Sequence, residues 1–234
     1  MASLEDLKLY QTNAHSCSYL DEQAITVFID PDTAVDKALY SQLSRHGFRR
    51  SGQHLYRPHC ESCRQCILAR IPAANFCFNR SQKRCFRGNS DLRVEIDAIS
   101  DMRTDYPLYA RYISERHRDG DMYPPSEDQY RSFLSAEWGV TRFARFYRGQ
   151  RLVAVSVFDL LDDGLSAVYT YFDPLEEKRG LGNYAILWQI EQTKSLGLDY
   201  LYLGYWIKDC QKMSYKINFR PLQLYIDRRW LTLG

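Results

Sequence analysis

The sequence predicts an α+β protein with two parts: a small cysteine-rich N-terminal domain over residues 1–100 and a larger C-terminal domain over residues 101–234. The chain of 234 residues is long enough for two hydrophobic cores. The first part mixes short β-like runs with turn residues, whereas the second alternates helical patterns with β-rich runs. Three of the seven cysteines also lie close together in the first part, at Cys60, Cys63 and Cys66.

The elements expected in the first part are short. Residues 25–29 (ITVFI) predict a strand, and a helix is expected over about 35–45. Gly47 follows at the place where many helices end in a left-handed residue. Residues 56–66 predict a loop, and residues 67–71 predict another strand. We therefore expect a small α+β unit here.

The second part has a more regular pattern. A helix is expected over 104–117, and the capping-box pattern at 126–129 opens a second helix that is expected to end at Gly139. Three β-rich runs with hairpin-length turns, an apolar helix and a final strand follow at 141–147, 152–160, 165–172, 181–196 and 200–205. This order predicts a mostly antiparallel sheet with flanking helices.

The same order is similar to that of the GCN5-related N-acetyltransferase (GNAT) fold. That resemblance implies an anion site at the helix N-terminus after the third β-rich run, where an acyl donor's phosphates meet backbone N–H groups. Lys178, Gly180 and Gly182 occupy this position. A tight strand-to-helix turn explains the two glycines equally well.

Composition and charge exclude several classes of protein. The chain is 45% hydrophobic and 26% charged, with a net charge of +2, as in an ordinary globular protein. No apolar run has the length of a membrane span, and the N-terminus lacks the pattern of a signal peptide, so we expect a cytoplasmic protein with no membrane partner. Seven cysteines do not form an even disulfide framework.

A basic segment and many tyrosines suggest two alternatives. Arg80, Lys83, Arg84, Arg87 and Arg93 lie in a short stretch, and the chain has 18 tyrosines. Cations with aromatic neighbours suit RNA, because cations meet phosphates and rings stack on unpaired bases. A solvated basic face with tyrosine-rich packing is the other interpretation.

The cysteines also allow two interpretations. Cys60, Cys63 and Cys66 have the spacing CxxCxxC, and Cys17 lies far upstream. Four thiolates of this kind can hold zinc or an iron–sulfur cluster. Partly buried free thiols are the alternative, because free cysteine behaves as a small hydrophobic residue.

Six separate motifs resemble one known family, the arginyl- and leucyl-tRNA–protein transferases. The matching segments are 56–66, 79–84 (the basic NRSQKR run), 169–174, 181–184, 202–207 and 212–216, in this order. The resemblance extends from about Cys17 to Tyr225. It is specific, because it joins both parts of the chain.

The short length and the lone Cys17 are similar to the bacterial, leucyl branch of this family. The resemblance implies leucyl-tRNA as donor, proteins with N-terminal Asp or Glu as acceptors, and delivery of the product to N-degron proteolysis. Arginyl-tRNA is the alternative donor, because both branches share the motifs. No cofactor is expected for the chemistry, since the donor ester is already activated. In the eukaryotic branch, paired cysteines imply a metal or an iron–sulfur cluster.

The candidate site residues follow from these motifs. Substrate-binding candidates are Arg80, Ser81, Gln82, Lys83, Arg84, Lys178, Gly180, Gly182, Tyr205, Lys212, Tyr215 and Lys216. Candidates for catalysis are Tyr171, Asp173 and Glu191, although packing, capping or solvated roles are equally natural for them. One cation of the basic segment is expected to pair with the acceptor carboxylate, and contact with tRNA phosphates is the alternative.

Two further functions remain open from the sequence. The glycine turn also suits a GNAT enzyme that uses acetyl-CoA, although that interpretation leaves the cysteine-rich part and the basic segment unexplained. A non-catalytic, zinc-dependent RNA-binding module is the other alternative. Sensitivity of the reaction to RNase separates the first from aminoacyl transfer, and metal analysis with a failed transfer assay favours the second.

Overall fold

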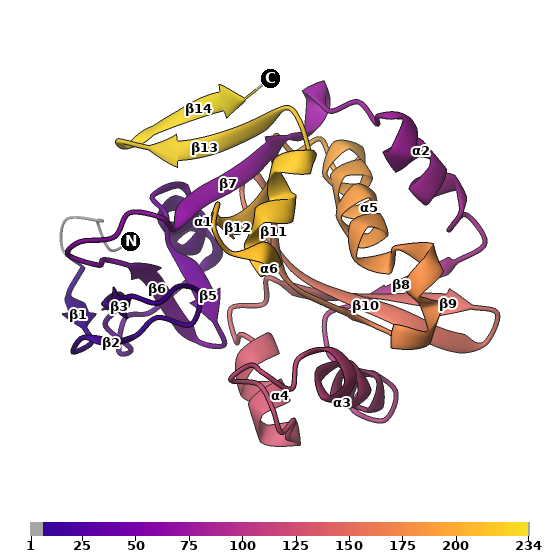
Figure 1. The fold of residues 1–234 in the computed structure, drawn as a ribbon, viewed down its shortest axis with the longest axis horizontal. Coiled ribbons are helices and arrows are strands. Elements are labelled where there is room, and N and C mark those ends of the chain that lie inside the picture. Colours follow the sequence, from indigo (N-terminus) through magenta and orange to yellow (C-terminus); the bar gives the residue numbers. More distant parts are fainter. Residues whose placement is uncertain (1–6, 234) are drawn as a thin grey trace.

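A twisted eight-stranded sheet organises the computed structural model, which describes residues 7–233 (Figure 1). In spatial order its strands are β14 (Arg229–Leu233), β13 (Leu222–Ile226), β7 (Ile67–Pro72), β12 (Tyr200–Trp206), β11 (Gly164–Phe172), β10 (Arg151–Leu160), β9 (Thr141–Arg148) and β8 (Arg93–Asp97). Neighbouring strands run antiparallel, except for the parallel pair β11 and β12. The mixed α/β class with a mostly antiparallel sheet is thus confirmed.

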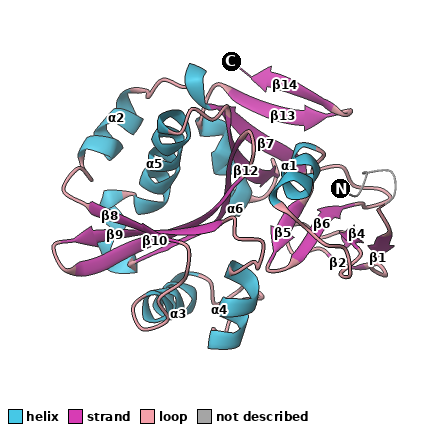
Figure 2. Ribbon diagram, turned by 180° about the vertical axis from the view of Figure 1, so that it is seen from behind, coloured by secondary structure: helices cyan, strands magenta, loops and turns pink. Residues whose placement is uncertain are grey.

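Helices cover both faces of this sheet (Figure 2). On one face lies α5 (Leu181–Ser195), and α2 (Arg80–Arg87) packs on the outside of α5. On the other face lie α3 (Asp105–Arg116) and α4 (Glu127–Leu134). Each face has its own apolar core, one built with α5 and one built with α3 and α4. Because α2 and α3 lie on opposite faces, α5 and the sheet separate them.

A second, smaller sheet forms the N-terminal lobe. Its strands in spatial order are β1 (Leu9–Gln11), β4 (Thr26–Ile29), β6 (His54–Pro58) and β5 (Arg49–Ser51), with a two-stranded ribbon of β2 (His15–Ser16) and β3 (Gln23–Ala24) nearby. Helix α1 (Lys37–Arg45) packs with this lobe. A third core, which includes Leu55 of the lobe and Tyr202 of the large sheet, joins the two parts.

A buried ion pair strengthens this junction. Arg50 of β5 and Asp159 of β10 are both fully buried, and Arg50 Nε lies 2.6 Å from Asp159 Oδ2. The carboxylate also accepts hydrogen bonds from Arg50 Nη2 (2.8 Å), the Tyr40 hydroxyl (2.8 Å) and the Thr141 hydroxyl (2.9 Å). A buried carboxylate needs this many donors, because it has lost its water. The N-terminal lobe is therefore tied to the large sheet by charge as well as by apolar contact.

Local caps set the ends of several helices. The Asp36 side chain accepts from the Leu39 N–H at the start of α1, and Ser126 does the same for Gln129 at the start of α4. Helix α2 begins with a full capping box, in which Asn79 and Gln82 bond each other's backbone N–H groups. These bonds satisfy N–H groups that have no partner inside the helix.

Strands β11 and β12 separate toward their carboxyl ends. Their parallel pairing begins at Gly164 and Tyr200 and stops at Ser166 and Tyr202. Beyond this point Arg49 of the N-terminal lobe lies between the strands: its Nη1 donates to Ser166 Oγ (2.7 Å) and its Nη2 donates to the Ala167 carbonyl. The guanidinium takes the place of the missing ladder partner, because a buried carbonyl needs a donor.

Gly204 of β12 allows the Arg49 side chain to approach the β12 backbone closely. Its φ of +74° is a conformation that glycine adopts without strain, and a Cβ there would lie 3.1 Å from Arg49 Nε. A β-bulge between Tyr202 and Gly204 shifts the pairing with β7 at the same place. The gap between β11 and β12 is therefore built into the sheet and supported by the N-terminal lobe.

Most of the expected elements are present, with two corrections. The strand at 25–29, the helix near 35–45, the strand at 67–71 and the seven elements of the second part are confirmed in type and order. The second helix of that part ends at Leu134 instead of Gly139, because the chain turns extended at Ser135. The expected loop at 56–66 begins later, since β6 continues to Pro58.

Other elements were not expected. They are the strands β1, β2, β3, β5, β6, β8, β13 and β14, the helix α2, and the short helices η2 (Ala73–Asn75), η3 (Pro174–Arg179), α6 (Gln211–Ser214) and η4 (Tyr215–Asn218). Strand β7, from the first part of the sequence, lies inside the large sheet between β12 and β13. The boundary near residue 100 stays a prediction. Within residues 7–233, no helix combines the length and apolar character that crossing a membrane requires.

Candidate functional site

The carboxyl end of β11 lies next to the N-terminus of α5. Gly180 has a left-handed conformation (φ +62°) and precedes α5, which has no side-chain cap at its N-terminus. Gly182 lies in the first turn, where a Cβ would be 3.4 Å from Cε1 of Phe172, the last residue of β11. The uncapped N–H groups of the first turn can therefore receive an anion. Lys178 is exposed just before this turn and has no side-chain partner among residues 7–233.

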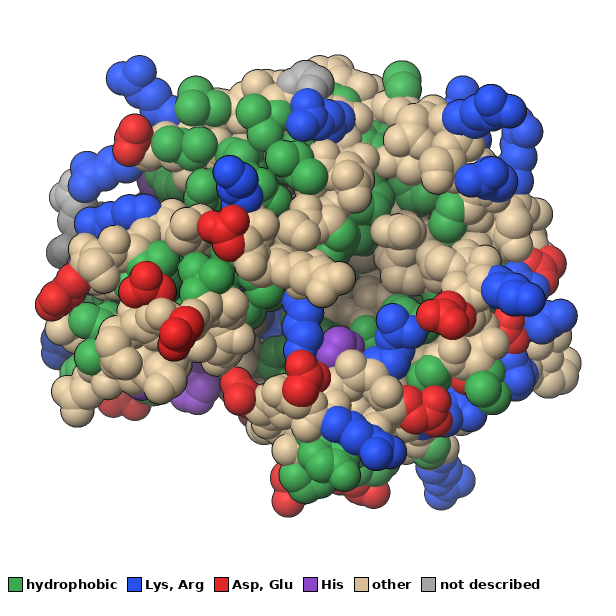
Figure 3. All heavy atoms as spheres, viewed as in Figure 1, with side chains coloured by type: hydrophobic (Ala, Val, Ile, Leu, Met, Phe, Trp, Pro, Cys, Tyr) green, Lys and Arg blue, Asp and Glu red, His purple; other side chains and the backbone are tan. Residues whose placement is uncertain are grey.

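A row of unpaired cations lies next to this turn on α2. Its members repeat at positions i, i+3, i+4 and i+7, so they share one helical face, which we call the α2 basic face: Arg80, Lys83, Arg84 and Arg87. All four are exposed, and in the described part of the chain none has a side-chain partner. Figure 3 shows Lys and Arg side chains gathered over α2.

The opposite face of α2 fixes its position against the start of α5. Cys85 Sγ lies 3.7 Å from the Gly180 carbonyl, and Asn89 Nδ2 donates to the Arg179 carbonyl at 2.9 Å. Gln82, one of the predicted residues, caps α2 and donates to the Asn218 carbonyl of η4 at 3.2 Å. Ser81 is exposed on the first turn of α2. The fold thus brings the predicted basic segment and the predicted glycine turn side by side.

A hollow opens on the other side of the β11 end (Figure 3). The Phe172 ring packs at a tilt against Tyr112 of α3, 4.9 Å between ring centroids, and Tyr112 packs in the same way against His117 at the same separation. Burial raises the pKa of Tyr112 to about 12, with a further contribution from nearby Tyr215 of η4. Lys212 of α6 reaches across to Asp119, 2.7 Å away. Lys212 and Tyr215, two predicted residues, therefore lie near α3.

The other two predicted residues of this region are buried. Tyr205 of β12 donates its hydroxyl hydrogen to the Gly47 carbonyl at 2.7 Å. Lys216 is 4% exposed and donates to the Tyr205 carbonyl. Burial, with the nearby Arg49 charge, lowers the pKa of Lys216 to about 7. Both side chains support the gap from inside and present no open surface to a ligand.

The three catalytic candidates do not converge. Tyr171 is fully buried, and its hydroxyl bonds Tyr130 at 2.8 Å inside the α3–α4 core. Asp173 is also fully buried, where it caps η3 and pairs with Arg111 at 3.0 Å. Glu191 lies in the middle of α5 and pairs with Lys194. Tyr171 and Asp173 therefore make the contacts of packing and capping residues, and their catalytic role stays an untested prediction.

The cysteines of the predicted metal set lie near one another. Burial raises the pKa of the Cys66 thiol to about 12, and the neighbouring thiols Cys17, Cys60, Cys63 and Cys210 raise it further. Within residues 7–233, however, no three His, Cys, Asp or Glu side chains have an arrangement that would hold a metal ion. This conformation does not itself form the ligand set, and the metal site stays a prediction.

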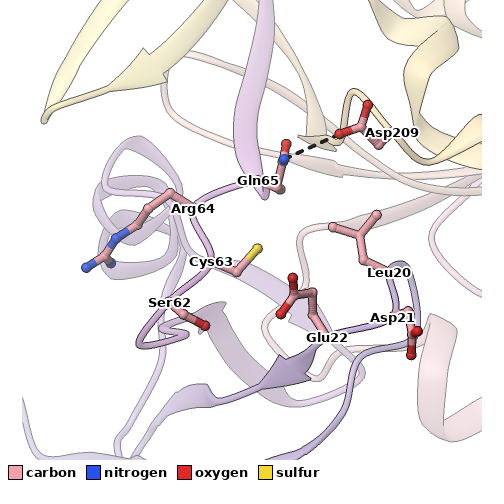
Figure 4. Close-up of a pocket in the computed structure, with 8 residues that line it drawn as sticks. All are labelled: Leu20, Asp21, Glu22, Ser62, Cys63, Arg64, Gln65 and Asp209. Atoms are coloured by element: carbon pink, nitrogen blue, oxygen red, sulfur yellow. Dashed lines mark hydrogen bonds between the residues drawn. The ribbon is translucent and has the colours of Figure 1, made fainter.

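A pocket of about 470 Å³ lies beside these thiols. Cys63 and Glu22 point into it, and Gln65 reaches across to Asp209 at 3.4 Å (Figure 4). The pocket joins the cysteine loop to the turn after β12. It is open to solvent and carries charges of both signs.

Sequence patterns do not single out Arg49, which lies in the gap between β11 and β12, or Arg116 and His117, which contact Phe172 and Tyr112 at the end of α3. Arg49 is one of two adjacent basic residues in a short strand, and only the separation of two distant strands gives it its partners. Arg116 and His117 end a predicted helix in a charge-dense run, which alone indicates only a solvated helix end.

Comparisons with known proteins agree on a family. A family model described as the N terminus of arginine-tRNA-protein transferase matches residues 15–84, and one described as its C terminus matches residues 104–226. Similar curated proteins include an aspartate/glutamate leucyltransferase of Saccharophagus degradans (55% identical, covering 99% of both chains). Proteins with the same name from Teredinibacter turnerae (56% identical, 100% of this chain and 97% of that one) and Pseudomonas fluorescens (54% identical, 100% of both) are also similar.

Similar solved structures are more distant. L-PGS from Bacillus licheniformis is 8% identical, covers 60% of this chain and 45% of that one, and has a TM-score of 0.47. A GCN5-related N-acetyltransferase from Kribbella flavida is 13% identical, covers 77% of this chain and 58% of that one, and has a TM-score of 0.37. Scores this low do not establish a relationship. The two family matches and the full-length relatives suffice: the chain belongs to the arginine-tRNA-protein transferase family.

Proposed function

We propose that this enzyme transfers leucine from leucyl-tRNA to the α-amine of proteins that begin with Asp or Glu. Relatives more than half identical over their whole length carry the name aspartate/glutamate leucyltransferase. The observation that carries the proposal is that an uncapped helix N-terminus and the end of β11 lie beside α2, whose outer side is the unpaired α2 basic face. Such a surface suits the 3′ end of a charged tRNA, which brings phosphates and an activated ester together.

The donor would lie across α2 and the start of α5. The α2 basic face and Lys178 offer positive charge to phosphates, while the first turn of α5 offers N–H groups. The 2′- or 3′-ester of the terminal ribose would then reach the gap between β11 and β12. This placement is GNAT-like, because the acyl group enters where two parallel strands separate.

The chemistry is the aminolysis of an ester. The acceptor nitrogen attacks the carbonyl carbon, a C–N bond forms, the C–O bond to the ribose breaks, and the ribose oxygen leaves with a proton. About a tenth of a free α-amine is already neutral at pH 7, since its pKa is about 8. Holding the two reactants together can lower the barrier by about 7–11 kcal/mol. No covalent enzyme intermediate and no cofactor are needed.

The product carries a new N-terminal leucine. As an apolar N-terminal residue, this leucine would mark the protein for N-degron proteolysis, in keeping with the family. The enzyme would thus act on the acceptor before a separate recognition step. Its direct partners are the charged tRNA and the acceptor protein.

The proposal is tested by measuring transfer for every combination of donor tRNA and acceptor peptide. The purified chain is incubated with labelled Leu-tRNA or Arg-tRNA and with peptides that begin with Asp, Glu, Arg or Ala. We expect label from Leu-tRNA on the Asp and Glu peptides only, and loss of the signal after RNase treatment. Label from Arg-tRNA alone would refute the leucyl donor. RNase-insensitive transfer from acetyl-CoA would refute aminoacyl transfer altogether.

A further inference from the structure

An acceptor that begins with Asp or Glu brings a side-chain carboxylate close to the reacting amine. A cation that reads this carboxylate must lie near the end of β11, where the ester is expected. The α2 basic face is poorly placed for that role, because α5 and the sheet lie between α2 and the hollow above α3. Two cations lie closer to this region: Arg116 of α3 lies over the Phe172 ring, and Lys212 of α6 pairs with Asp119 just after α3.

Of the cations in this region, Arg116 in the last turn of α3 forms the weakest ion pair within the protein. Its Nη1 lies 3.8 Å from Glu177, a side chain that is 80% exposed, so this ion pair contributes little. Its guanidinium lies over the Phe172 ring, 5.7 Å from the centroid, which keeps the charge close to the end of β11. By contrast, Lys212 is held by Asp119 at 2.7 Å and Arg111 by the buried Asp173 at 3.0 Å.

His117 follows directly and supplies a proton acceptor. Its ring packs at a tilt against Tyr112, and its backbone N–H caps the end of α3 by donating to the Ile113 carbonyl. Partial burial lowers the pKa of His117, and the charges of Lys212 and Arg116 lower it further, whereas Asp119 acts in the opposite direction. The imidazole is therefore neutral at pH 7 and can take a proton.

We propose that the end of α3 receives the N-terminal residue of the acceptor: the Arg116 guanidinium binds the Asp or Glu carboxylate, and the His117 imidazole takes the proton that the neutral α-amine loses as it attacks the ester. This inference rests on the proposed function. As the C–N bond forms, the nitrogen passes one proton to His117, and as the C–O bond breaks, His117 passes that proton to the departing ribose oxygen. The step needs no other reactant.

The arrangement explains why two acidic residues are accepted. The side chains of Asp and Glu differ by one methylene, and the long, partly exposed Arg116 side chain can adjust to either. Asn and Gln have the same shapes but lack the charge, so they do not form the charge-assisted bidentate bond. Discrimination between Asp and Asn is therefore the property that Arg116 controls.

The test compares Arg116→Gln and Arg116→Lys with the control Arg118→Gln. Arg118 is an exposed cation two residues away, whose guanidinium contacts only the Ser114 carbonyl among the described residues. Leucylation of peptides beginning with Asp, Glu, Asn and Gln is measured from Leu-tRNA, together with Leu-tRNA affinity. We expect Arg116→Gln to raise KM for the Asp and Glu peptides by about 10- to 100-fold and to leave tRNA affinity unchanged. Arg116→Lys keeps part of the preference, and Arg118→Gln behaves as wild type.

His117→Gln tests the proton acceptor. We expect a lower kcat with little change in KM, and loss of the decline in kcat that the wild type shows as pH falls through the lowered His117 pKa. Thermal unfolding of each variant shows whether its fold is intact.

Three results would overturn the inference. One is an Asp-over-Asn preference that survives in Arg116→Gln. Another is an equal loss for all four peptides with weaker Leu-tRNA binding, which would place Arg116 at the donor. The last is an unchanged pH profile in His117→Gln. Failure of the proposed function is distinct, because the wild type would then leucylate no peptide.

Discussion

Replacing Asp159 by Asn tests how strongly the N-terminal lobe is tied to the large sheet. The carboxylate accepts two hydrogen bonds from Arg50, one from Tyr40 and one from Thr141, all within 2.9 Å. Asparagine has nearly the same shape but offers one oxygen, and its NH₂ group faces donors. Arg50, whose side chain is fully buried, is left as an uncompensated charge.

The expected loss can be worked out from these hydrogen bonds. Breaking a buried pair by removing one partner costs about 3–5 kcal/mol, and each stranded donor alone costs about 1–3 kcal/mol. With a urea m-value of about 3 kcal/mol/M for a chain of this size, the midpoint of urea unfolding falls by about 1–1.7 M. Circular dichroism during a urea titration measures this shift.

Asp162→Asn is a matched control for the same substitution. Asp162 lies three residues further along and pairs with Lys37 at 3.5 Å, with both side chains more than two-fifths exposed. Its replacement should cost less than about 1 kcal/mol. Equal midpoints for the two variants would refute the reasoning. So would a double variant, Arg50→Met with Asp159→Asn, whose loss of stability equals the sum of the single losses, because residues in one network should couple.

Three further predictions concern the basic face, a buried lysine and the thiols. Replacing the α2 basic face with Gln should lower the salt dependence of Leu-tRNA binding, by about 0.7–0.9 in the log–log slope for each phosphate that is no longer neutralised; an unchanged slope would show that these cations do not meet tRNA. The pKa of Lys216 is about 7 in the folded state and about 10.5 in the unfolded state, so between these pH values the unfolded state binds more protons. The free energy of unfolding of the wild type should therefore rise by about 2 kcal/mol from pH 7 to pH 9 relative to that of Lys216→Met. Urea titrations that give parallel pH curves for the two proteins would contradict this. Iodoacetamide at pH 7.5 should label the exposed Cys77 long before Cys66, whose pKa is raised to about 12, and mass spectrometry of timed samples would reveal the reverse order.

The sequence predicted the second part of the fold well, because its signals are local. Turns of hairpin length set the pairing of β9, β10 and β11, and an apolar run marked α5. Helix α2 was missed although its capping box is visible in the sequence. Among its eight residues only Cys85 and Phe86 are apolar, so no apolar stripe indicates a helix.

The placement of β7 could not be read from the sequence. Its run of apolar residues indicates a buried strand, but its neighbours β12 and β13 lie more than a hundred residues away in the chain. Pairing of this kind depends on the whole fold and leaves no local pattern. The same is true of Arg49, whose partners Ser166 and Ala167 are available only because β11 and β12 separate.

The sequence motifs identified only some of the residues of the candidate site. Lys178, Gly180 and the basic segment were predicted from motifs, and the structure brings them together beside the start of α5. Tyr205 and Lys216 carry the same kinds of polar group but are buried under the gap. A motif does not distinguish a side chain that faces a ligand from one that supports the backbone behind it.

The position of β7 has a consequence for how this protein is made. On the ribosome, β7 emerges early, yet the strands on either side of it, β12 and β13, end at residues 206 and 226 of 234. Before β12 and β13 are synthesised, the apolar side chains of β7 have no large sheet to pack in. The central sheet can therefore close only after β12 and β13 have been synthesised, and a nascent chain stalled before residue 200 would leave the apolar strand β7 exposed to chaperones and proteases. We therefore expect a chain truncated before residue 200 to be degraded and not to accumulate as a partly active fragment.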